Sequence, residues 1–183
     1  PHQAAALLDA VGPRRPIAVM LDADPAGRAA TRHAWEVLAD AGATHLRHVT
    51  LPDGKDPAEL VRNGRGHVLQ QAVYRNTPLA HAVADITVTM AAATSGEWQR
   101  GLLTAQQLFR DDLHRVPTDQ VADYITHVAE RLRLPTDMVT AAAADAVAAG
   151  PVAHHGTSTQ GGVGPAPPAF RTTVRQTALE ISR

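Results

Sequence analysis

The sequence predicts an α/β unit, in which helices flank a parallel sheet, followed by an all-α helical subdomain. A short apolar run at residues 16–21 and an alternating stretch at 45–51 enclose a helical pattern. Strand, helix and strand in this spacing form a βαβ unit with a right-handed crossover. After Pro78 every pattern is helical. Hydrophobic residues make up 44% of the chain and aromatic ones 3%, so Ala, Leu and Val must build the core.

The first predicted helix covers residues 3–11 and stops at a Gly-Pro step. The apolar run at 16–21 has the length and the flanks of a buried strand in a parallel sheet. Pro25 suits the first position of a helix, and the helix that it opens continues to Ala41. One face of that helix is predicted to carry Ala30, Ala34, Val37 and Leu38.

Short helices follow the second predicted strand. One is expected over 57–62, because Pro57 suits its start, and another ends near Tyr74 after the break at Asn63-Gly64.

Three longer helices are predicted in the second half of the chain. Apolar side chains recur there at helical spacing in two sets, Trp98, Leu102, Ala105 and Phe109, then Val121, Ile125, Val128 and Leu132. Thr118 is the candidate N-cap of the second of these helices, and Pro135 opens a third that runs to about Ala149.

Composition sets the expected boundaries. The predicted pieces are the α/β part, the helical subdomain, a Gly/Pro/Ser-rich flexible linker and the start of a truncated helical domain, at 1–76, 77–149, 150–169 and 170–183. The chain begins at Pro1 with residues that already predict a helix, so we expect it to be a fragment of a larger protein.

Several classes of function are disfavoured by composition alone. The chain has no cysteine, which excludes disulfides and cysteine-bound zinc within it. A net charge of −1 gives no overall nucleic-acid footprint. No apolar run approaches the ~20 residues that span a bilayer, so a cytoplasmic protein without a membrane partner is expected. Lys55 is the only lysine among many arginines and alanines, a bias typical of a GC-rich bacterial genome.

Asp22 and Asp24 end the first apolar run and lead directly into the helix that Pro25 opens. Residues i and i+2 of a strand point to one face, so we expect the two carboxylates to lie side by side. Like charges that close repel unless a cation lies between them, and Mg²⁺ prefers such oxygen ligands. The alternative is that Asp24 caps the helix and Asp22 is a loop residue.

A second acidic segment, Leu51-Pro-Asp-Gly-Lys-Asp56-Pro57, follows the next predicted strand. Ligands of open α/β sheets bind beyond the carboxyl ends of the strands, so Asp56 is placed to face the first pair of aspartates. The alternative is a polar turn followed by a helix that Asp56 caps.

Taken together, Asp22-Ala-Asp24-Pro-Ala-Gly27, a helix, a strand and then Leu51-Pro-x-Gly-x-Asp56-Pro resemble the Toprim domain of bacterial DnaG-type DNA primases. The helices after Pro78 look like the subdomain that follows Toprim in those enzymes. The resemblance covers residues 1–149 and is strongest over 17–64.

The resemblance implies that Asp22, Asp24 and Asp56 are catalytic residues that bind Mg²⁺ or Mn²⁺. It implies synthesis of RNA primers by metal-dependent nucleotidyl transfer, with single-stranded DNA, ribonucleoside triphosphates and a replicative helicase as partners. Any zinc would belong to an amino-terminal domain outside this chain, as would the family's catalytic glutamate. Ala58 stands where many members carry another acid, which would weaken one metal site or leave Asp53 to complete it.

Arg28 and Lys55 are the candidate phosphate contacts beside these acids, with Arg32 and Arg62 nearby; ordinary surface arginines and a turn lysine are the alternatives. Two other functions stay open. The first alternative to a primase is another Toprim enzyme, such as a topoisomerase or nuclease, and the second is a degenerate Toprim module that only binds DNA or a helicase. The fragment alone is expected to be inactive.

Overall fold

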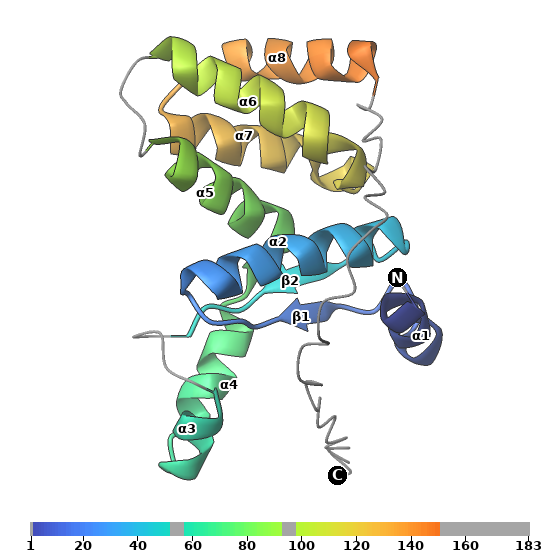
Figure 1. The fold of residues 1–183 in the computed structure, drawn as a ribbon, viewed down its shortest axis with the longest axis vertical. Helices are drawn as coiled ribbons and strands as arrows, with labels where there is room; N and C mark the ends of the chain where they lie inside the picture. The colour runs from blue at the N-terminus through green and yellow to red at the C-terminus, as the bar shows by residue number, and fades with distance from the viewer. Residues whose placement is uncertain (1, 52–56, 93–97, 151–183) are drawn as a thin grey trace, which may run out of the picture. The chain divides into compact units, whose positions relative to one another are not determined.

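The structure is a computed structural model that describes residues 2–51, 57–92 and 98–150 (Figure 1). Its helices are α1 (His2–Val11), α2 (Pro25–Asp40), α3 (Pro57–Arg62), α4 (Gly66–Tyr74), α5 (Leu79–Ala92), α6 (Trp98–Asp112), α7 (Val121–Leu132) and α8 (Thr136–Ala149). The strands are β1 (Ile17–Val19), β2 (Leu46–His48) and β3 (Thr77–Pro78), and the 3₁₀ turns η2 (Leu113–Arg115) and η3 (Thr118–Gln120) precede α7. An α/β part followed by helices is confirmed.

The three strands form a small mixed sheet in the order β1-β2-β3. β1 and β2 are parallel, with Ile17 opposite Leu46, and α2 connects them as predicted. β3 pairs antiparallel with β2, so the expectation of a purely parallel sheet is corrected. A two-residue strand that ends in proline has no alternating pattern, which is why the sequence did not reveal it. β1 lies at one edge of this sheet.

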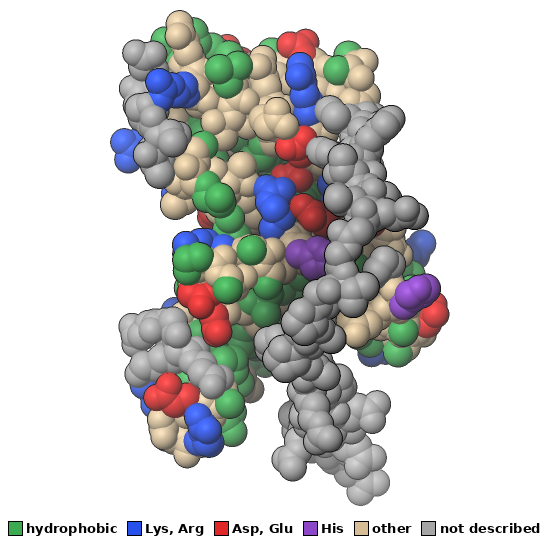
Figure 2. Space-filling model, in the orientation of Figure 1, with side chains coloured by type: hydrophobic (Ala, Val, Ile, Leu, Met, Phe, Trp, Pro, Cys, Tyr) green, Lys and Arg blue, Asp and Glu red, His purple; other side chains and the backbone are tan. Residues whose placement is uncertain are grey.

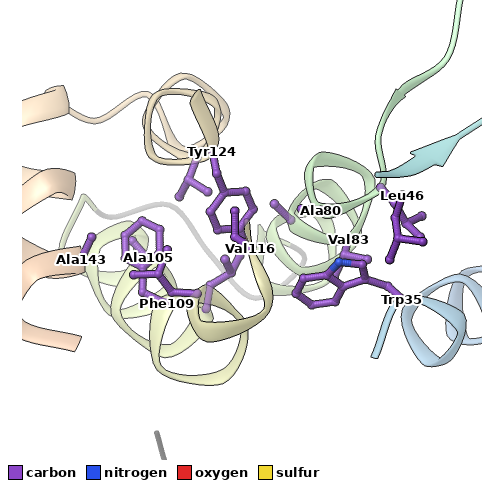
Figure 3. Close-up of a cluster of buried hydrophobic side chains, with 14 of the residues drawn as sticks. Trp35, Leu46, Ala80, Val83, Ala105, Phe109, Val116, Tyr124 and Ala143 are labelled. Atoms are coloured by element: carbon purple, nitrogen blue, oxygen red, sulfur yellow. The ribbon is translucent and has the colours of Figure 1, made fainter. Parts of the chain in front are cut away.

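The buried face of α2 differs from the predicted one. Trp35 and Leu38 are buried, and so is Thr31, whereas Ala30 is exposed. The indole of Trp35 is the largest apolar group of the helix, and burying it turns the inner face away from Ala30. Figure 3 shows this side chain beside Val83 of α5.

The helical part packs α6 against α8, with α7 in contact with both α5 and α8. Phe109 and Tyr124 meet edge to face, with ring centroids 6.1 Å apart (Figure 3). The predicted stripe of α6 is confirmed at Ala105 and Phe109 but not at Trp98, whose side chain is 59% exposed. Thr118 does not cap α7; it begins η3, and α7 starts three residues later.

One cluster of buried hydrophobic side chains runs through the described residues, from Ala4 and Leu8 of α1 to Ala146 of α8. Alanine, leucine and valine dominate it, as the composition predicted. The cluster continues across the predicted boundary between 76 and 77, because α5 contacts both α2 and α7. The predicted linker and tail from residue 151 onward lie outside the described residues. Among those described, no helix is both long and apolar enough to cross a membrane.

Candidate functional site at the strand ends

The two aspartates lie where the sequence places them along the chain, just beyond β1, and both side chains are exposed. The strand itself ends at Val19, earlier than the predicted Leu21. The alternation of a strand therefore does not set the directions of Asp22 and Asp24. Their positions depend on the turn into α2 instead.

Asp24 is the N-cap of α2. Its Oδ1 accepts a hydrogen bond of 2.6 Å from the backbone N–H of Gly27, and Pro25 occupies the first position of the helix. This is the helix-capping alternative raised for Asp24, and it fixes the carboxylate against the helix start. Capping uses one carboxylate oxygen and leaves Oδ2 free of this bond, so a cap and a metal ligand are compatible in one side chain.

Gly27 is buried at the place where α2 meets the end of β1. A Cβ added there would lie far inside van der Waals contact with the carbonyl oxygen of Asp22. Only glycine allows the helix to begin this close to the loop. Thr31 adds to the fit, because its hydroxyl is buried and donates to the Gly27 carbonyl at 2.8 Å.

The two arginines of α2 have different environments. Arg28 is exposed, and its Nη1 donates to the Ala23 carbonyl at 2.6 Å, which holds the guanidinium beside the acidic loop. Arg32 instead donates to the carboxylate of Asp112, at 3.3 Å, and to the Thr87 hydroxyl. Arg32 is therefore committed to helix packing, whereas Arg28 stays a candidate phosphate contact.

Asp56 and Lys55, together with Asp53, lie outside the described residues, as does the predicted capping of α3 by Asp56. Within the described part of the chain no three His, Cys, Asp or Glu residues converge in a way that holds a metal. Two carboxylates are nevertheless a reasonable partial set for Mg²⁺, which keeps several waters and often takes one or two carboxylates plus substrate phosphates. The donor chemistry of Asp22 and Asp24 thus fits the ion, and the three-aspartate site stays a prediction.

A cavity of about 340 Å³ opens beside Asp22 at the carboxyl ends of β1 and β2. The polar residues that line it are Asp22, Arg28, Thr31, His48, Thr50, Thr77 and Asp85. Its apolar lining is Met20, Leu21, Ala23, Leu51, Pro57, Ala82 and Ile86. A concave, mostly apolar space with a few convergent polar groups is the usual form of a small-molecule site.

Asp85 is the acidic group that α5 contributes to this cavity. Its Oδ1 accepts from His127 Nε2 at 2.9 Å and from Arg131 Nε at 2.6 Å, so α7 holds the carboxylate in place. His127 also stacks on His81, with ring centroids 4.1 Å apart. Burial lowers the pKa of His48 below 6.5, partly opposed by Asp85, which favours a neutral imidazole in the cavity wall.

The sequence did not identify His48 or Asp85 as site residues. Neither belongs to a motif, and Asp85 lies on α5, far along the chain from Asp22. Their common feature is the cavity that the fold creates. Figure 2 shows acidic and basic side chains interspersed on one face rather than gathered into one basic patch, in keeping with the small net charge.

The fold and this site define an α/β unit with acidic residues at its strand ends. Residues 2–61 match the model of the Toprim-like family. A 50-residue segment is 44% identical to a DNA primase of Clostridium acetobutylicum; it makes up 27% of this chain and 8% of that protein. A crystal structure of a DNA primase domain from Pseudomonas aeruginosa shares the fold, with a TM-score of 0.53 and 21% identity, over 76% of this chain and 43% of the solved one.

These similarities bear out the resemblance predicted from the two acidic segments: residues 2–61 are Toprim-like, and the chain is similar to DNA primases in a segment of its sequence and in its fold. The chain spans less than half of the solved primase domain that it matches.

Proposed function

We propose that this chain is part of a DNA primase, in which Asp22, Asp24 and Asp56 bind Mg²⁺ or Mn²⁺ and serve nucleotidyl transfer to a growing RNA primer. The observation that carries the proposal is the turn between β1 and α2. There the Asp24 cap and the close approach at Gly27 hold two exposed carboxylates at the strand ends. Similarity of a 50-residue segment of this chain to a DNA primase favours this enzyme over a topoisomerase or a nuclease.

Each described residue has a defined part in this proposal. Asp22 and Asp24 supply negative oxygens for the ion, and the capping bond restricts the motion of Asp24. Arg28, held by the Ala23 carbonyl, is placed to contact a nucleotide phosphate. A bound divalent ion would supply positive charge that offsets the charge of the triphosphate. The partners proposed are a single-stranded DNA template, ribonucleoside triphosphates and a replicative helicase.

The metal site is tested by isothermal titration of the full chain with Mn²⁺ and Mg²⁺. Asp22→Asn and Asp24→Asn are the informative variants, because asparagine preserves the shape and can still cap α2 while the charge is lost. Each is expected to weaken binding by about tenfold or more. Asp9→Asn, an exposed acid on α1, is the control and should bind like the wild type.

Primer synthesis by the full-length protein provides the second measurement. Either substitution at the pair should abolish it while the circular dichroism spectrum is unchanged. Wild-type metal affinity together with full activity in both variants would refute the proposal. Two features of the sequence favour one competing function, a Toprim module that only binds a partner: Ala58 lacks a carboxylate, and the net charge is close to zero. Absence of metal binding in the wild type would support that competitor.

A further inference from the structure

We propose that the cavity beside Asp22 holds the nucleoside of a ribonucleoside triphosphate, and that Asp85 selects ribose by accepting a hydrogen bond from a sugar hydroxyl. This inference rests on the proposed function, because it assigns a place to the sugar and base of the nucleotide whose phosphates the aspartates and Arg28 would hold.

The cavity has the composition that a nucleoside needs. Its volume of about 340 Å³ lies within the ~300–1,000 Å³ typical of small-molecule sites. Leu21, Leu51 and Ile86 offer apolar surface to a base, while Thr50 and Thr77 offer hydroxyls to polar atoms. Asp22 of the acidic loop lines the same cavity, so phosphates held at Asp22 lie next to the space proposed for the nucleoside.

The carboxylate of Asp85 has an oxygen that can accept a hydrogen bond from a hydroxyl group. Both hydrogen bonds from α7, from His127 and from Arg131, go to Oδ1, which leaves Oδ2 available to a ligand. Both oxygens of a carboxylate can accept hydrogen bonds, so Oδ2 can take a hydroxyl donor while Oδ1 stays paired with Arg131. Carboxylates that accept from a ribose hydroxyl are a recurring device in nucleotide-binding α/β folds.

A simpler explanation is that Asp85 only ties α5 to α7. The same pair of helices carries a second pair of this kind, in which His81 Nε2 lies 3.2 Å from Asp123 Oδ2. Asp123 does not line the cavity. Both aspartates thus pair with a histidine across α5 and α7, but only Asp85 also binds an arginine, Arg131, and only Asp85 lines the cavity. Asp123 is therefore the control for the loss of a histidine–aspartate contact between these helices.

The test measures binding of ATP and of 2′-deoxyATP and 3′-deoxyATP to the full chain in Mg²⁺, by isothermal titration. The wild type should prefer ATP over one of the deoxy forms. Asp85→Ala should weaken ATP binding about tenfold to a hundredfold, because a hydrogen bond to a charged group is lost. The affinity of the same variant for that deoxy form should stay within about twofold of the wild-type value. Asp123→Ala should keep the full preference, and Asp85→Asn, which preserves the side-chain shape, should show a reduced one.

The outcomes separate this inference from the proposed function. If Asp85→Ala weakens all three nucleotides equally, or if Asp123→Ala has the same effect as Asp85→Ala, the role of Asp85 is structural and the inference is refuted. It is refuted too if the wild type binds metal through Asp22 and Asp24 but does not distinguish ATP from the deoxy forms. In that case the proposed metal function still stands, whereas loss of metal binding itself overturns the proposed function.

Discussion

Asp112 is the one acidic side chain among the described residues that is almost fully buried, at 1% exposed. It accepts from Arg32 of α2 at 3.3 Å, and so joins α6 to the α/β part. Burial raises its pKa from 3.8 to about 6, and Arg32 opposes that rise without cancelling it. The buried hydroxyl of Tyr124, whose pKa is raised chiefly by burial and also by Asp112, has no hydrogen-bond partner in the described part of the chain. For the pKa of Asp112, the effect of burial therefore outweighs the effect of the ion pair with Arg32.

The raised pKa of Asp112 predicts a pH-dependent stability. Between the unfolded pKa of 3.8 and the folded value of about 6, the folded state binds the proton more tightly. Stability from this group is thus fully present below about pH 4 and is lost as the pH rises through about 6, by at most about 3 kcal/mol. Asp112→Asn mimics the neutral carboxyl, so it should equal the wild type near pH 4 and exceed it in stability at pH 7.

Urea denaturation of both proteins at pH 4 and pH 7 checks this expectation. The difference between them isolates Asp112, since all other acids titrate in both. If Asp112→Asn is instead less stable at pH 7 by several kcal/mol, the bond with Arg32 outweighs burial and the direction argued above is wrong.

Among individual residues, the sequence motifs marked only those that lie close together in the chain. Asp22 and Asp24 stand next to a recognisable helix start, and Gly27 belongs to the same motif. Asp85 and Asp112 depend on partners contributed by other helices, Arg131 and Arg32, and no local pattern marks such a pairing. Fold geometry, which brings α5 to the strand ends, is needed to find them.

At the scale of elements, α2 is fixed at its start by capping and by close packing, and along its length by Trp35. Its bounds were predicted within a residue, because Pro25 and Gly42 mark its two ends in the sequence. The predicted inner face was less accurate, because it included Ala30 and Ala34, and alanine side chains have little surface to bury. β3 was missed for the opposite reason: tertiary pairing with β2 creates a strand that has no local signal.

Gly27→Ala should displace α2 from the end of β1. The new methyl group would collide with a backbone carbonyl, that of Asp22, which cannot rotate away like a side chain. Overpacking of this kind costs about 1–3 kcal/mol or more. Gly66→Ala is the matched control, because no atom lies within 4 Å of the Cβ position at the start of α4, and alanine favours helix by about 1 kcal/mol.

Urea denaturation of the two variants measures the difference, and metal titration shows whether the displaced helix also weakens the site at Asp22 and Asp24. Equal stabilities for Gly27→Ala and the wild type would show that the turn relaxes around the methyl group. The close approach would then have no bearing on the geometry of the acidic pair.

At the scale of the whole molecule, one continuous hydrophobic core runs through the described residues. α5 connects the sheet to the other helices, since it contacts α2, β2, α6 and α7. Composition predicted an aromatic-poor core and periodicity predicted most of the helices. Neither predicts that α1 and α8 contribute to the same cluster, because long-range contacts are set by the fold as a whole.

A continuous core predicts that the α/β part and the helical part unfold together. Trp35, which is 2% exposed, reports on α2 in the α/β part and its packing against α5, whereas far-ultraviolet circular dichroism reports on the helices of both parts together. Trp98 is 59% exposed, so Trp98→Phe should change stability by no more than about 0.5 kcal/mol and leave Trp35 as the sole tryptophan. In that variant the two signals should give the same urea midpoint, as a two-state transition requires.

A fluorescence midpoint clearly below the midpoint from circular dichroism would mean that the α/β part opens by itself. The acidic site would then belong to the less stable portion of the protein, and its metal affinity should fall in low urea before the helices unfold.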